Sequence, residues 1–184
     1  MTARDLSTLE GLDPKAVEEA LIVLRRESDR GAILVAIAIL DDVFLSRLNQ
    51  LLDRGNSDAR NRLLKPPLGA LGSFSAKVDL AYCIGMIPTQ IYADIKLLNK
   101  LRNLCAHEWG DFAITEDIVE KFIQPMVMKK AIDAANELDP IFFPPGCPPK
   151  QVLVSTLAAL ITFVNLHKPL PQLSISERSD GEIS

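Results

Sequence analysis

The chain has 184 residues, a size typical of one globular domain with its own core. Its acids outnumber its bases, 24 against 20, and the formal net charge is -4 at pH 7. Phosphate backbones repel such a chain unless its basic residues gather on one face, which disfavours tight binding to nucleic acid. The three cysteines have no paired spacing, which argues against a disulfide framework and predicts a cytoplasmic protein.

Neither the N-terminus nor the apolar runs predict export or a membrane anchor. The first fifteen residues carry acids early and lack the basic start and apolar stretch of a secretory signal. Residues 31–40 and 152–166 are uncharged, but both runs are shorter than the roughly 20 apolar residues that a bilayer crossing requires. We therefore expect buried helices and no membrane contact.

Two helices are predicted at the start of the chain. Asp13 and Pro14 supply an N-cap and a first helical residue for a short amphipathic helix. A long helix then extends from about residue 30 to residue 54. Its first half is apolar on every side, which is typical of a central helix.

The next predicted element is a short helix near residues 58–65, which Pro66 and Pro67 end. It carries the most basic patch of the chain, formed by Arg60, Arg62 and Lys65. These three side chains are candidates for contact with nucleic acid or with an acidic partner. The alternative is an ordinary solvated surface.

Two helices are predicted in the middle of the chain. After the glycines at 69 and 72, Ser73 or Ser75 can cap a helix that Gly85 ends. The following helix begins at Pro88, extends to about His107 and packs on the long helix. Its outward face is expected to carry the charged side chains Asp94, Lys96 and Lys100.

The last third of the chain predicts a helix over residues 116–138 with a kink near Gln124, because Pro125 interrupts it. A proline-rich strap and a final helix over 151–167 follow. No segment alternates like a strand, so the expected class is all-α: a compact multi-helical bundle around the long helix, with one domain over residues 1–167. Residues 168–184 are polar and acidic and predict a disordered tail.

An ordered set of glycines and apolar residues in the middle of the chain resembles the core of a known family. A Pro-Leu-Gly segment leads into a helix with the pattern Leu-x-Tyr-x-x-Gly-x-Ile, carried by Pro67, Leu68, Gly69, Leu71, Gly72, Leu80, Tyr82, Gly85 and Ile87. This pattern is similar to that of the mannitol operon repressor family over residues 29–125. The resemblance implies a transcriptional regulator without a helix-turn-helix that acts through a protein partner or through weak contact with nucleic acid.

The end of the helix predicted at 88–107 holds the candidate for catalysis. Arg102, Asn103 and His107 resemble the Arg-x4-6-His motif of HEPN-type helical domains. The resemblance implies either an RNA-binding domain or metal-independent RNA cleavage, in which His107 moves the 2′-hydroxyl proton and Arg102 holds the phosphate. Residues five apart on a helix lie about 140° apart. Arg102 and His107 can therefore share a site only if the helix ends between them or if a second copy of the chain brings them together. We expect a homodimer.

A structural role is the alternative for the same residues. Arg102 would pair with an acid such as Asp41 or Asp42, and His107 would end the helix, where a cation is favoured. Cys105 and His107 have no second pair nearby and do not predict a zinc site. Cys83 and Cys105 fall on apolar helix faces and are expected to be small core residues. The glycines also lack the order of a nucleotide-binding fingerprint, so we expect neither a metal nor a cofactor.

Overall fold

The computed structural model describes residues 14–52, 57–64, 69–138 and 146–167. Within these ranges the chain forms helices and no strand, which confirms the all-α prediction. The helices are α2 (Pro14–Arg26), α3 (Asp29–Leu51), α4 (Ser57–Leu64), α5 (Phe74–Cys83), α6 (Thr89–His107), α7 (Glu116–Ile118), the π-helix η1 (Val119–Ile123), α8 (Val127–Leu138) and α9 (Pro149–Leu166). The predicted cap at Asp13, most of the proline-rich strap and the predicted disordered tail lie outside the described residues.

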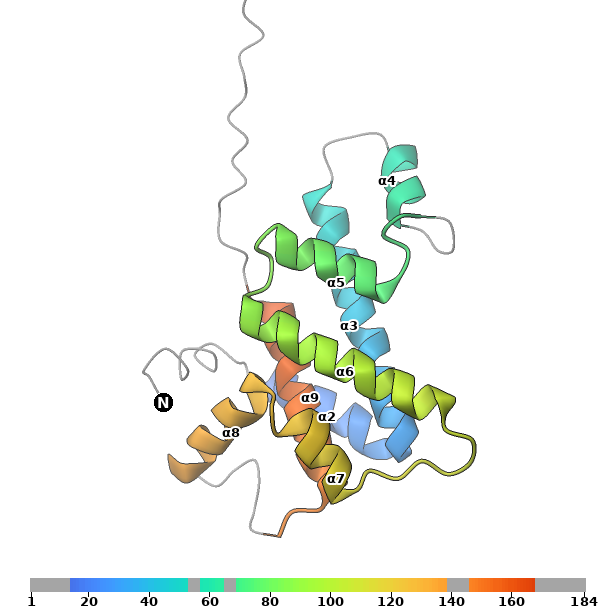
Figure 1. Cartoon of the computed structure of the whole chain (residues 1–184). Coiled ribbons are helices and arrows are strands. Elements are labelled where there is room, and N and C mark those ends of the chain that lie inside the picture. The colour runs from blue at the N-terminus through green and yellow to red at the C-terminus, as the bar shows by residue number, and fades with distance from the viewer. Residues whose placement is uncertain (1–13, 53–56, 65–68, 139–145, 168–184) are drawn as a thin grey trace, which may run out of the picture.

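The long helix α3 and the last helix α9 share the centre of the bundle (Figure 1). Helix α9 packs against α2 and α3, while α5 and α6 pack against α3. Every residue of α9 from Leu153 to Thr162 is buried. The hydroxyls of Thr156 and Thr162 are satisfied inside this apolar environment, because they donate to carbonyl oxygens one turn earlier at 2.8 and 2.9 Å.

Burial explains the apolar sequence of α9. By length and composition alone this helix could cross a membrane, but 67% of it is buried inside the fold. The run at 152–166 therefore forms core, as expected for a buried helix.

Local signals set most helix ends where they were predicted. The Ser28 Oγ accepts the Gly31 amide at the start of α3, and the Ser73 Oγ accepts the Ala76 amide at the start of α5. Gly85 follows α5 with a φ of +71°, a conformation that costs glycine little. The interruption at Pro125 is confirmed, because the π-helix ends at Ile123 and α8 begins only at Val127.

The prediction that Asp94 points outward is wrong. Asp94 is 1% exposed, and its carboxylate accepts the backbone amides of Val127 and Met128, each at 2.9 Å. The first amides of α8 lack intrahelical acceptors, so a side chain from α6 caps them. Burial is the main influence on this carboxyl and raises its pKa from 3.8 to about 6, while the two amides and Lys130 act in the opposite direction.

Candidate functional site

The motif predicted for catalysis lies on the last two turns of α6. Arg102, Asn103 and His107 are all exposed, and α6 ends at His107. The Arg102 guanidinium donates to the Asn103 side-chain oxygen at 3.1 Å. The three side chains are accessible, but the described contacts do not join Arg102 to His107.

The structural alternative for Arg102 is wrong in its choice of partner. Asp41 is paired with Lys77, whose Nζ lies 2.6 Å from the Asp41 Oδ1, and Asp42 is exposed. The reason is that α5 packs against α3 and brings the buried Lys77 side chain to Asp41. Arg102 on α6 is therefore not needed to neutralise this carboxylate.

The start of α3 holds the loop that leaves α6. The Arg30 guanidinium donates to the carbonyl oxygens of Glu108 and Gly110, both at 2.8 Å. The neighbouring Asp29 carboxylate accepts the Ile114 amide at 2.8 Å and lies 3.3 Å from the Lys150 ammonium. Both ends of the loop from residue 108 to residue 114 are thus attached to the start of α3.

Trp109 lies between the two carbonyl groups that Arg30 binds. It is the single tryptophan of the chain and is 100% exposed. Leu104, on the last turns of α6, is also exposed, at 43%. Tryptophan is a residue type that dominates protein interfaces once it is covered. Sequence reasoning missed Trp109, although a lone tryptophan beside Glu108 and Asp111 was the available signal.

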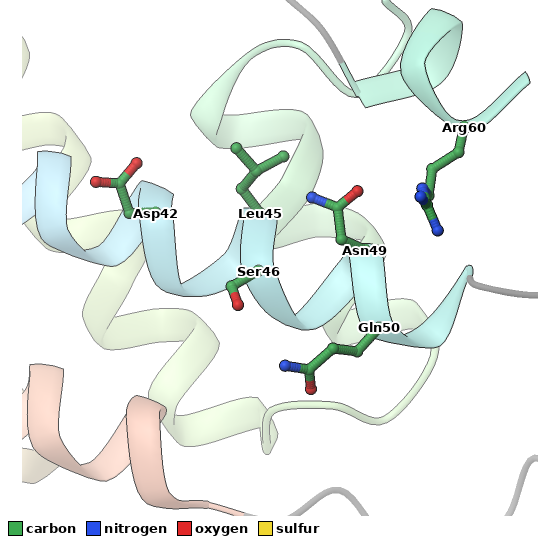
Figure 2. Close-up of a pocket in the computed structure, with 6 residues that line it drawn as sticks. All are labelled: Asp42, Leu45, Ser46, Asn49, Gln50 and Arg60. Carbon is green, nitrogen blue, oxygen red and sulfur yellow. The ribbon is translucent and has the colours of Figure 1, made fainter. Parts of the chain in front are cut away.

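A shallow polar groove follows the second half of α3 (Figure 2). It has a volume of about 540 Å³ and is lined by Asp42, Leu45, Ser46, Asn49 and Gln50 of α3 and by Arg60 of α4. A second groove of about 590 Å³ shares three of these residues and extends to the end of α9.

The predicted basic patch does not form a uniformly basic surface. Arg60 is half-buried and faces the groove that Asp42 also lines, whereas Arg62 is exposed on α4. Lys65 lies outside the described residues. Charges of both signs in one groove weaken attraction to a phosphate backbone, which depends on concentrated positive charge.

The described residues include no group of three or more His, Cys, Asp or Glu side chains that could hold a metal ion. Cys105 is buried, as predicted for a small core residue, and burial raises the pKa of its thiol. Cys83 is exposed, so its prediction as a core residue is wrong. It lies in the last turn of α5, on the side that faces solvent.

Comparison with known proteins assigns a family to this fold. Residues 26–141 match the mannitol repressor family. A chain in the X-ray structure of the MtlR–HPr complex from Escherichia coli has a similar fold, with a TM-score of 0.59 and 22% identity over 83% of this chain and 99% of that one. No individual curated protein matched. Since the family match extends over more than half of the sequence, the chain belongs to the mannitol repressor family.

Proposed function

We propose that this chain is a cytoplasmic transcriptional regulator, a repressor of the mannitol repressor type, that acts by binding another protein. The family match carries the proposal, because it includes α3, α5, α6 and α8 in one stretch. The similar solved chain comes from a complex with HPr. We extend that partner to this protein and propose that it binds HPr.

The charges of the described surface support a protein partner over nucleic acid. The guanidinium groups of Arg30 and Arg47 donate to backbone carbonyls of distant segments, Arg30 at an exposed position and Arg47 at a half-buried one. Lys77 is buried against Asp41. Donors used in this way are not available to phosphates, and the net charge of the whole chain is negative.

The expected homodimer stays a prediction. The apolar run at residues 152–166 does not require a second copy, because packing within the chain buries Leu153–Thr162.

Binding to HPr tests the proposed function directly. We expect isothermal titration of the full chain with purified HPr from the same organism to give a saturable complex in the micromolar range or tighter, typical of regulatory contacts. Deleting the gene should also raise expression of a reporter under the mannitol operon promoter. Absence of binding at about 100 μM HPr, a concentration at which a micromolar complex saturates, would exclude this partner.

The ribonuclease alternative is tested by His107→Ala in an RNA cleavage assay with EDTA present. We expect the wild type and the variant to behave alike, because Arg102 and His107 are not brought together within one chain. Cleavage that is lost in both His107→Ala and Arg102→Ala, but kept in a Lys100→Ala control, would contradict this expectation. Lys100 is an exposed cation on the same helix.

A further inference from the structure

We propose that the two grooves along α3 form one binding site for a neutral, linear molecule rich in hydroxyl groups, a sugar alcohol. The two grooves share Asp42, Ser46 and Gln50, so they are parts of one depression, which we call the α3 groove. One part is bounded by α4, and the other extends to the end of α9. The inference does not depend on the proposed protein partner.

The sequence of α3 builds the floor of the α3 groove. Asp42, Ser46 and Gln50 are exposed and recur every four positions, which places them along one stripe of the helix. Asn49 leaves α3 beside this stripe, and Arg60 reaches from α4 (Figure 2). The volume of about 540 Å³ in the first part lies in the range of sites for small molecules.

The polar side chains of the α3 groove suit a ligand that carries hydroxyl groups. The uncharged ones are Ser46, Asn49, Gln50 and Asn165. Each of them can both donate and accept a hydrogen bond, as each hydroxyl group of a polyol can. Among the described residues, no hydrogen bond or ion pair involves these four side chains. Asn99 and Ser75, by contrast, bond to each other at 3.1 Å across the contact of α5 and α6.

The charges of the α3 groove favour a neutral ligand. Asp42 and Arg60 place one charge of each sign in the first part. In the second part Asp42 is accompanied by Arg47, whose guanidinium already donates to the carbonyl oxygens of Val164 and His167 at the end of α9. A phosphorylated ligand would require an excess of available positive charge, which this lining does not supply.

The apolar side chains of the α3 groove favour a linear molecule over a ring. A ring sugar presents an apolar face, which the flat face of an aromatic side chain would cover. Among the described residues, no aromatic side chain lines either part of the groove. Leu45 and Val43 offer small aliphatic surfaces instead. A linear polyol carries a hydroxyl group on every carbon and can follow the groove along α3.

The binding site is tested by nuclear magnetic resonance on the full chain labelled with ¹⁵N, because the side-chain amides of Asn49, Gln50 and Asn165 give signals of their own. The probes are the linear hexitols sorbitol and mannitol, the ring sugar glucose, and sorbitol 6-phosphate. We expect both hexitols to shift these three signals with a dissociation constant on the order of 1 mM, as suits a small ligand in an open groove. Glucose and the phosphate should bind at least threefold more weakly, and NaCl should not change hexitol affinity.

The variants Asn49→Ala and Gln50→Ala should each weaken hexitol binding about fivefold, the loss expected for one hydrogen bond. Gln90→Ala removes an exposed amide from α6 and is the matched control, which should bind like the wild type. All three variants should keep the wild-type circular dichroism, because no hydrogen bond among the described residues involves these side chains.

Three results would overturn the inference. The first is the absence of any shift at about 50 mM hexitol, a concentration that saturates a millimolar site. The second is a set of shifts away from the α3 groove that Asn49→Ala and Gln50→Ala leave unchanged. The third is binding of glucose or of sorbitol 6-phosphate that is as tight as binding of the hexitols, which would contradict the linear or the neutral character of the ligand.

Discussion

When the pH is lowered from 8 to 5, the unfolding free energy of the wild type is expected to rise by about 1.4 kcal/mol relative to that of Asp94→Asn. This difference corresponds to a factor of about ten in the folding equilibrium constant. The cause is the burial of the Asp94 carboxyl, which raises its pKa from 3.8 to about 6 in the folded chain. The folded state therefore takes up a proton before the unfolded state does. This stabilisation is complete below pH 3.8, where it reaches roughly 3 kcal/mol, and is lost as the pH rises through 6.

The titration of His167 changes the stability of the fold in the opposite direction, over a pH range that overlaps with that of Asp94. Burial, and then the Arg47 guanidinium, lower the pKa of His167, so the unfolded chain protonates first as the pH falls. That effect destabilises the fold below about pH 6.5. Since His167 is present in both proteins, it cancels in the comparison with Asp94→Asn.

Urea unfolding at four or five pH values from 5 to 8 measures the difference for both proteins. The amide introduced by Asp94→Asn keeps one oxygen that can accept an α8 backbone N–H, so the variant should also carry a constant loss of about 1 kcal/mol at every pH. Glu137→Gln, which neutralises an exposed carboxyl on α8, is a suitable control in the same region. Parallel stability curves for the wild type and Asp94→Asn would show that Asp94 does not titrate as described.

The second large effect concerns the pair of Lys77 and Asp41, in which the two partners are unequally buried. The Lys77 side chain is 1% exposed, whereas the Asp41 side chain is 33% exposed. Asp41→Asn leaves a buried ammonium without its counter-charge and should cost about 2–4 kcal/mol of unfolding free energy. Lys77→Met removes the buried charge and leaves a carboxylate that water can reach, so it should cost less, about 1 kcal/mol.

Thermal and urea unfolding of both single variants and of the double variant would measure this asymmetry. The double variant should resemble Lys77→Met, because once the ammonium is gone Asp41 has little left to neutralise. Asp42→Asn on the exposed side of α3 is the matched control and should change stability by less than about 0.5 kcal/mol. Equal losses for Asp41→Asn and Lys77→Met would contradict the explanation from burial.

Local chemistry made the helices predictable from the sequence. The Ser73 cap, the glycine after α5 and the interruption at Pro125 all act over a few residues, so their effects are visible in one stretch of chain. Helix α3 ends at Leu51, three residues before the predicted end at Arg54, because the periodic apolar pattern does not mark a helix end closely. The pattern of glycines and apolar residues also carried the family resemblance, which the match over residues 26–141 confirms.

The sequence by itself determined the helical class, the order of the helices, most of their ends and the family, because these depend on periodicity, caps and local motifs. Only the tertiary structure decided the environment of the charged residues. Asp94 meets amides more than 30 positions away, Asp41 meets Lys77 across 36 positions, and Arg30 reaches the carbonyls beside Trp109 across 78 and 80 positions. Which helices pack together decides whether such a side chain is solvated, is paired or holds the loop that carries Trp109. The reason is that burial changes the free energy of a charged side chain far more than the adjacent residues in the sequence do.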